Sequence, residues 1–386
     1  MTVTLGALLQ RIEREPDAER RFSFFMPTAH GPCRFGVYNV LHKIVLERLG
    51  HDERVGVWTP SCKGYFDDLP GGFALMVFTG FVADDWLTAA LHDARPVEKT
   101  RGAAQAVWNR WHRELCDRLR ERARGDLSMP SALLELASGR LFGTQELLAR
   151  AAADFARVRQ ERDLPTVLVV GEIYARLDPG TNDHVVEKLE QRGLRVRLAP
   201  FNEWLEYTDT LNREREGADR TFSAQVSSWM QTLVTNVLYG TVARVLGWPA
   251  RTTVADALRA GRDYVRPELH GEAVLTLGGP LHEWRDELID GVVSVGPLEC
   301  MPNKIAEAQF FHVAEREGLP NLTIGLNGDP IDPEILDTFA FEIHTRREAR
   351  RRGERPAAAV RRDAGERERL VQLRVRRGDE TPVVAD

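Results

Sequence analysis

The sequence has few cysteines and no long apolar run. Only four of its 386 residues are cysteine, and Cys33, Cys62, Cys116 and Cys300 lie far apart, which argues against a secreted scaffold held by disulfides. No stretch approaches the roughly 18 continuous apolar residues of a membrane span. The first residues, to Glu19, have neither the basic region nor the cleavage pattern of a signal peptide. We therefore expect a mature cytoplasmic protein.

Phosphate-binding motifs are absent as well. The sequence contains no Gly-x-x-x-x-Gly-Lys-Ser/Thr loop, and no Gly-x-Gly-x-x-Gly follows a predicted strand, so the chain is not expected to hydrolyse ATP itself. Its net charge is −6, and the arginine-rich segment near the C-terminus is interleaved with acids. The charge pattern indicates no nucleic-acid-binding face.

Short apolar runs alternate with segments of helical periodicity. The apolar fraction of 43% fits a globular protein, and the length of 386 residues fits two or three domains. Runs of the parallel-strand type, each followed by a loop and a helix, predict an α/β fold of two Rossmann-like, doubly wound, mainly parallel domains. A helical insertion is expected within the first domain, and a charged tail, helical or disordered, at the end. The predicted bounds are 1–162, 163–345 and 346–386.

Cys300 follows the most apolar of these runs. The segment Gly291–Pro297 predicts a buried strand, and an amphipathic helix is expected after Pro302. Cys300 thus lies between the carboxyl end of a strand and a helix N-terminus, where open α/β sheets bind ligands. A helix N-terminus favours an anion, so we expect a lowered thiol pKa that suits a thiolate metal ligand.

Cys33 has the same setting, because a strand near Phe22–Met26 precedes it and a helix follows it. If the two domains face each other, Cys33 and Cys300 open into one cleft and form a metal or iron–sulfur site. Other interpretations stay open: two buried loop cysteines, a zinc site with His30, or a cysteine nucleophile. Cys62 also follows a predicted strand, so it is either a third ligand or a buried side chain. Cys116 lies on a long predicted helix and is most simply a packing residue.

A second candidate group lies at the end of the strand Thr166–Val170. Glu172 and Arg176 follow it directly, so they are expected to bind a cofactor or substrate at the cleft. The alternative is an acid at a helix start that pairs with an arginine. Glu203 lies in the same position after the next predicted strand.

Several segments together resemble a known family. They are Gly31-Pro-Cys-Arg-Phe-Gly-Val-Tyr-Asn39, Arg95-Pro-Val-Glu98, Gly171-Glu-Ile-Tyr-Ala-Arg176 with Asn182, Glu203-Trp204 and Val295-Gly-Pro-Leu-Glu-Cys-Met-Pro302. In this order they are similar to the carboxyl-terminal part of acyl-CoA dehydratase activase-related proteins, relatives of 2-hydroxyacyl-CoA dehydratase and benzoyl-CoA reductase subunits. The resemblance covers roughly residues 22–345.

The resemblance implies a two-domain subunit that holds a [4Fe–4S] cluster between its domains, with Cys33 and Cys300 as ligands. It also implies an ATP-hydrolysing iron–sulfur activator that delivers low-potential electrons, and a CoA-thioester substrate. The chain departs from the family pattern twice. The third cysteine, usually nearer the amino terminus in a Cys-x-Pro type segment, is not found, so a companion chain or Cys62 is expected to supply it. Glu299 replaces a small residue and places a negative charge beside the expected cluster.

The sequence therefore predicts a cytoplasmic iron–sulfur subunit of an ATP-dependent 2-hydroxyacyl-CoA dehydratase-like or acyl-CoA reductase-like system. No residue is assigned a catalytic role. The alternative prediction is a non-catalytic electron-transfer or assembly subunit, or a two-domain binding protein without a cluster. Neither prediction includes nucleic acid or a membrane as a partner.

Overall fold

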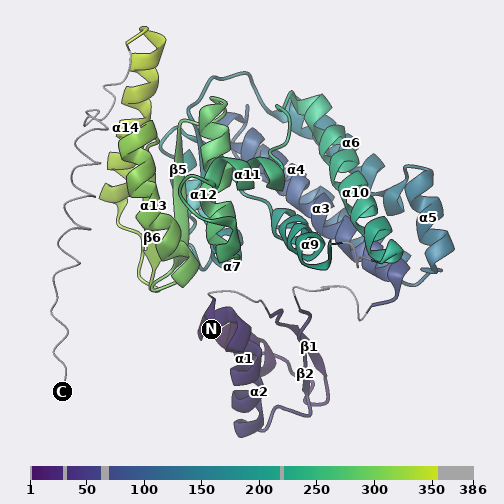
Figure 1. Cartoon of the computed structure of the whole chain (residues 1–386). Coiled ribbons are helices and arrows are strands. Elements are labelled where there is room, and N and C mark those ends of the chain that lie inside the picture. Colours follow the sequence, from purple (N-terminus) through teal and green to yellow (C-terminus); the bar gives the residue numbers. More distant parts are fainter. Residues whose placement is uncertain (1, 29–32, 62–68, 218–220, 355–386) are drawn as a thin grey trace, which may run out of the picture.

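Parallel strands in two separate sheets give the protein its α/β class. A computed structural model of the chain describes residues 2–28, 33–61, 69–217 and 221–354. Three lobes are visible, and the N-terminal one lies beside the other two (Figure 1). Two Rossmann-like domains are not confirmed, since the first sheet has only two described strands.

The N-terminal lobe is the described part of residues 2–61. Its elements are α1 (Thr2–Glu13), β1 (Phe22–Phe25), the 3-10 helix η1 (Arg34–Val37), α2 (Tyr38–Arg48) and β2 (Val55–Trp58). The two strands are parallel, with Phe22 opposite Val55. Leu8 and Ile12 of α1 pack on Leu46 of α2 to form a small core of their own. Strand–helix–strand order and parallel pairing agree with the sequence prediction for this segment.

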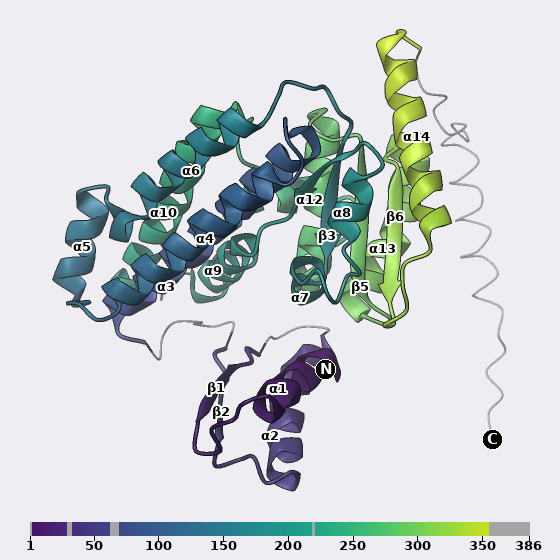
Figure 2. The same cartoon turned by 180° about the vertical axis from the view of Figure 1, so that it is seen from behind.

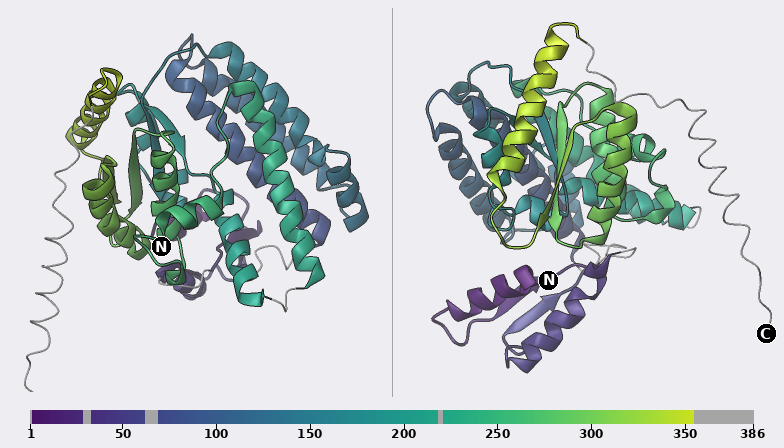
Figure 3. Two further views of the ribbon diagram at one scale, coloured as in Figure 1. Left: turned by 45° about the horizontal axis from the view of Figure 1, so that its top comes forward. Right: turned by 90° about the vertical axis from the view of Figure 1, so that its left-hand side faces the viewer.

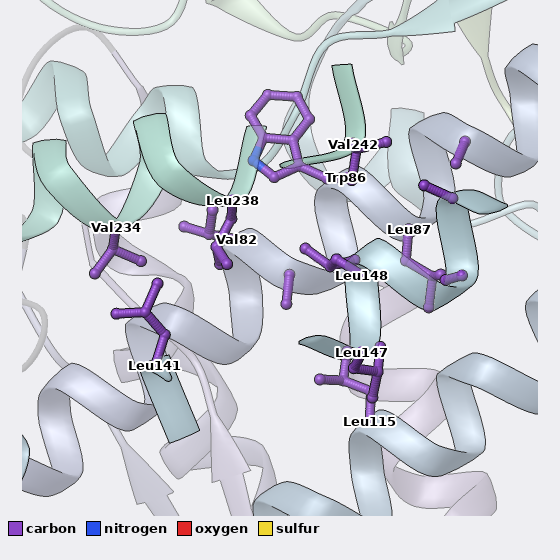
Figure 4. Close-up of a cluster of buried hydrophobic side chains, with 14 of the residues drawn as sticks. Val82, Trp86, Leu87, Leu115, Leu141, Leu147, Leu148, Val234, Leu238 and Val242 are labelled. Atoms are coloured by element: carbon purple, nitrogen blue, oxygen red, sulfur yellow. The ribbon is translucent and has the colours of Figure 1, made fainter. Parts of the chain in front are cut away.

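The helical lobe consists of long helices around one apolar core. It contains α3 (Gly71–Ala94), η2 (Arg95–Val97), α4 (Ala103–Arg122), α5 (Met129–Ala137), η3 (Leu141–Gly143), α6 (Thr144–Val158) and α10 (Phe222–Leu246). Trp86 and Leu87 of α3 meet Leu148 of α6 and Leu238 of α10 in this core (Figure 4). Because α10 comes from beyond the predicted domain bound at residue 162, the core draws on both sides of that bound.

Helix α3 has the length and composition of a membrane span. The segment Gly71–Val97 passes that test, but 61% of its apolar window is buried inside the protein. The acids Asp84 and Asp85 interrupt it, and its apolar side chains fill the core of the helical lobe. Here α3 is therefore the core helix of a soluble fold.

The sheet lobe is built on four parallel strands. Its elements are β3 (Thr166–Gly171), α7 (Ile173–Leu177), α8 (Val185–Glu190), β4 (Arg195–Leu198), α9 (Asn202–Glu216), α11 (Val254–Gly261), η5 (Pro267–Leu269), α12 (Ala273–Arg285), β5 (Gly291–Pro297), α13 (Met301–Glu317), β6 (Asn321–Leu326) and α14 (Pro333–Arg351). The strand order is β4-β3-β5-β6. Helices α8 and α14 cover one face of the sheet, and α12 and α13 cover the other (Figures 2 and 3).

This strand order creates a switch point between β3 and β5. The chain leaves β3 toward β4 on one side and, after β5, moves to β6 on the other. In open α/β sheets the crevice at the carboxyl ends of two such strands is the usual ligand site. The backbone N–H of Glu172 donates to the carbonyl of Val295 across this point, at 2.9 Å. Glu172 and Cys300 thus follow the two strands that border the switch point.

Two differences from the sequence predictions concern helices. Helices α11 and α12 were not predicted, because Gly278, Gly279 and Pro280 obscure the helical periodicity of α12. The predicted tail begins inside α14, since the helix continues to Arg351 and Arg347 pairs with Asp163 and Asp290. Residues 355–386 lie outside the described part of the chain.

Candidate functional site: a thiol pair between two lobes

Cys33 and Cys300 both stand at the N-cap of a helix. Cys33 caps η1, and its Sγ accepts a hydrogen bond from the backbone N–H of Phe35 at 3.4 Å. Cys300 caps the 17-residue helix α13, whose first turn contains Pro302. Both side chains are half-buried and free of disulfides. The equivalent placement agrees with the sequence prediction, although η1 spans only four residues.

The two thiols meet at the boundary between the N-terminal lobe and the sheet lobe. Next to Cys33, the guanidinium of Arg34 donates to the backbone carbonyl of Glu299 at 2.5 Å, joining residues 265 positions apart. The thiols are near enough that negative charge on Cys33 raises the pKa of Cys300. Glu299 adopts a left-handed backbone, with φ of 62°, a conformation that favours a small residue such as glycine. The structure therefore brings the predicted pair together.

The expected lowering of the thiol pKa values is wrong. Burial raises the pKa of Cys33, and it raises the pKa of Cys300 to about 12. Burial outweighs the hydrogen bonds from backbone N–H groups, and the nearby carboxyl groups of Glu272 and Glu172 add smaller increases to both pKa values. Both thiols are thus protonated at neutral pH, which disfavours a cysteine nucleophile. A metal ion would have to displace both protons on binding.

The turn after β3 positions Glu172 beside the thiols. Gly171 has φ of +111°, and a Cβ there would lie 1.9 Å from the carbonyl oxygen of Val295, so only glycine fits. Glu172 follows as the N-cap of α7 and accepts a hydrogen bond from the N–H of Ala175 at 2.7 Å. The Asn182 amide donates to the carbonyls of Ala175 and Arg176 and fixes the far side of the turn. Glu172 is therefore an acid at a helix start, as the alternative interpretation expected, whereas the ion pairs of Arg176 are with Glu203 and Glu272.

Arg176 is buried rather than exposed in the cleft. Only 1% of its side chain is exposed. Its guanidinium donates to the carbonyls of Gly171 at 2.9 Å and Pro200 at 3.0 Å, and to Glu203 Oε1 at 3.0 Å. These hydrogen bonds link β3 to the start of α9, and the expectation that Arg176 binds a cofactor or substrate at the cleft stays a prediction.

Two residues of the site were missed by sequence reasoning. Glu272 directly precedes α12, and its Oε1 lies 3.8 Å from a guanidinium nitrogen of Arg176. Burial raises the pKa of Glu272 well above its ordinary value. Tyr38, the first residue of α2, has its pKa raised by burial and then by the charges of Cys33 and Cys300. Tyr38 was within the quoted motif around Cys33, whereas no spacing signal pointed to Glu272.

The described residues supply two soft donors and no complete metal cage. No group of three or more His, Cys, Asp or Glu side chains within residues 2–28, 33–61, 69–217 and 221–354 is arranged to hold a metal ion. The predicted third ligand Cys62 and the zinc candidate His30 lie outside the described residues. Cys116 is half-buried on α4, in the helical lobe. The thiol pair fits a thiolate-bound group in donor type and position, with further ligands still to be supplied.

The chain matches no family model, no curated protein and no solved structure.

Proposed function

We propose that the protein is a cytoplasmic iron–sulfur subunit of an ATP-dependent 2-hydroxyacyl-CoA dehydratase-like or acyl-CoA reductase-like system. In this proposal Cys33 and Cys300 are ligands of a [4Fe–4S] cluster, as the resemblance to activase-related proteins implies. Cys62 or a companion chain supplies a further ligand. An ATP-hydrolysing iron–sulfur activator is the electron donor, and a CoA thioester is the acceptor.

The observation that carries the proposal is the meeting of Cys33 and Cys300 between two lobes. They come from distant parts of the sequence, yet each is the N-cap residue of a helix. Cys300 follows β5 at the switch point of the sheet, where α/β folds place ligands. Iron–sulfur clusters are held by cysteine thiolates on such rigid elements.

The chain's own residues would hold and orient the bound group. A [4Fe–4S] cluster supplies low-potential electron transfer when it is bound. Cys33 and Cys300 would anchor it, and the contact between Arg34 and Glu299 would keep the two anchors at a fixed separation. Glu172 caps α7 beside the thiols, and Arg176 holds this turn from behind. Tyr38 offers a hydroxyl at the same place, with a raised pKa that keeps it protonated.

We infer that the chain consists of two Rossmann-like domains, 1–162 with a helical insertion and a C-terminal one from residue 163. The parallel β1–α2–β2 unit and the parallel order β4-β3-β5-β6 support this description. An experimental structure of the complete assembly tests it, since a Rossmann-like first domain requires further parallel strands beside β1 or β2.

Anaerobic measurement of iron and acid-labile sulfide tests the cluster. Cys33→Ala and Cys300→Ala should each lose most of the iron found in the wild type, whereas Cys116→Ala, the matched control on α4, should keep it. Cys62→Ala distinguishes a ligand within the chain from one on a companion chain. Full iron content in both the Cys33 and Cys300 variants would show that the site assignment is wrong.

A second function is a non-catalytic electron-transfer or assembly subunit, or a binding protein without a cluster. The raised thiol pKa values favour the binding protein without a cluster, because protonated thiols bind metal only when protons are displaced. A protein without a cluster purifies colourless under strict anaerobiosis. An electron carrier holds iron but turns over no CoA thioester with any activator.

A further inference from the structure

A large cavity lies between the helical lobe and the sheet lobe, away from the thiol pair. Its volume is about 910 Å³, within the range of small-molecule sites. Trp86 of α3 and Tyr239 of α10 line one side, and Leu168 of β3, Arg197 of β4 and Glu283 of α12 line the other. Neither Cys33 nor Cys300 contributes to its lining. The cavity is therefore a compartment of its own.

Aromatic rings form one wall of this cavity. The Trp86 and Tyr239 rings meet edge to face, with centroids 4.9 Å apart, and the Trp248 ring lies 5.9 Å from Tyr239. Trp86 is buried, whereas Tyr239 and Trp248 are half-buried. A row of rings that reaches from the interior toward the surface offers a flat apolar ligand both stacking and edge contacts.

Four of the five arginines that line the cavity are paired with acids, and the exception among the described residues is the exposed Arg162. Arg197 donates to both carboxylate oxygens of Glu283, at 2.7 and 3.1 Å. Arg251 donates to both oxygens of Glu206, at 2.7 and 3.3 Å. Two-pronged pairs of this kind use the guanidinium geometry that would otherwise bind a phosphate or carboxylate. These paired arginines therefore provide little attraction for an anionic ligand.

Glu203 presents an available acceptor to the cavity. Arg176 donates to its Oε1 at 3.0 Å, and no described residue donates to its Oε2. Some 23% of the Glu203 side chain is exposed, and Glu203 lines the cavity. Burial nevertheless raises its pKa, as expected of a carboxyl group that faces a cavity rather than open solvent. An acceptor oxygen held in this way matches a hydrogen-bond donor on a ligand.

We propose that this cavity binds a small aromatic molecule, uncharged or cationic, whose hydroxyl or ammonium group donates to Oε2 of Glu203. The aromatic wall selects the ring. The paired arginines and the Glu203 carboxylate disfavour an anion. The site needs no metal and no thiol, so it stands independently of the iron–sulfur proposal.

Binding of four probes of similar size to the full chain tests the proposal. The probes are phenethylamine, 4-ethylphenol, ethylbenzene and 3-phenylpropionate, measured by calorimetry and by quenching of tryptophan fluorescence. Phenethylamine and 4-ethylphenol should bind more tightly than ethylbenzene and 3-phenylpropionate, and the better of the two donors identifies ammonium or hydroxyl as the preferred group. Absence of binding by both donors, or equal binding of 3-phenylpropionate, would overturn the proposal.

Variants assign the binding to this cavity. Glu203→Gln keeps the volume and one acceptor for Arg176, and it should weaken phenethylamine binding by about tenfold, the usual effect of losing a charged hydrogen-bond partner. Trp248→Leu changes the aromatic wall and should weaken the binding of both phenethylamine and 4-ethylphenol. Glu146→Gln, an exposed acid on α6 with 67% of its side chain accessible, is the control and should change nothing. Unchanged binding in Glu203→Gln and Trp248→Leu would place the probes elsewhere and refute the site. Iron content does not enter these measurements.

Discussion

Arg34 donates a hydrogen bond from its guanidinium to the backbone carbonyl of Glu299, at 2.5 Å. One residue follows Cys33 and the other precedes Cys300, so the bond holds the N-terminal lobe against the sheet lobe beside the thiol pair. Because the acceptor is a backbone carbonyl, the contact depends on the shape of the turn at Glu299 rather than on its side chain.

Replacing Arg34 should loosen this boundary without unfolding either lobe. Arg34→Met keeps the length of the side chain and loses the donor, which costs about 1 kcal/mol. We expect the amides of residues 298–301 to exchange with solvent several-fold faster, as measured by hydrogen–deuterium exchange. Arg48→Met, at an exposed position on α2, is the control. Equal exchange in both variants would mean that the Arg34 contact does not hold the lobes together.

Replacing Arg176 should be among the most damaging single changes in the sheet lobe. Arg176→Met removes three hydrogen bonds and leaves the carboxyl groups of Glu203 and Glu272 without their buried cation. Breaking a buried pair in this way costs about 3–5 kcal/mol of unfolding free energy. Urea denaturation measures the loss. Arg259→Met, whose side chain is 73% exposed, should stay within about 0.5 kcal/mol of wild type, and a similar small loss for Arg176→Met would contradict the role of the network.

Gly171 should tolerate no side chain. In Gly171→Ala the new Cβ would meet the Val295 carbonyl oxygen at 1.9 Å, in a backbone conformation with φ of +111°. The strands β3 and β5 would have to separate at the switch point, at a cost of about 3 kcal/mol or more. Thermal unfolding should detect a clear fall in Tm. Gly6→Ala in α1, where nothing lies within 4 Å of an added Cβ, should be neutral or slightly stabilising; similar behaviour of both variants would argue against the tight approach.

His92 should make the protein sensitive to acid. Burial, and then the charge of Arg95, lower the pKa of His92 to about 3, while the imidazole of an unfolded chain titrates near 6.5. Below pH 6.5 the unfolded chain binds a proton that the folded protein excludes. The contribution of neutral His92 to the unfolding free energy is therefore complete above pH 6.5 and is lost as the pH falls toward 3. Between pH 6.5 and 5 the loss is about 2 kcal/mol.

The difference between His92→Gln and wild type isolates this contribution, because carboxyl groups titrate in both proteins. The unfolding free energy of the variant should fall less between pH 6.5 and 5, as measured by urea denaturation at fixed ionic strength. Parallel pH profiles would show that His92 is protonated in the folded protein at little cost.

Local patterns in the sequence were enough to place both cysteines. The apolar run Gly291–Pro297 and the proline after Cys300 specify a strand and a helix start through short-range effects, and the same holds for Cys33. The pKa of each thiol was not predictable in this way. The helix N-terminus is local, but burial and the carboxyl groups of Glu172 and Glu272 come from tertiary packing, and they decide the direction of the shift.

Helix α12 illustrates why a site residue escaped prediction. Gly278 lies where α11 and α12 pack so closely that an added Cβ would be 2.0 Å from the carbonyl oxygen of Ala257. A glycine that is required by close contact between two helices predicts, from the sequence alone, a break in a helix. Without α12 there was no reason to place Glu272 near the end of β3. The extent of α14 was missed for a related reason, since Arg347, beyond the expected end of the helix, pairs with Asp163 and Asp290 far away in the sequence.

The buried guanidinium of Arg176 is shared by two carboxyl groups. It contacts Glu203, which faces the cavity, and Glu272, whose charge reaches both thiols. A proton or ligand taken up at one carboxylate changes how strongly the shared cation stabilises the other. The buried Arg176 cation therefore couples the charge states of two carboxyl groups, one that faces the cavity and one that lies near the thiols.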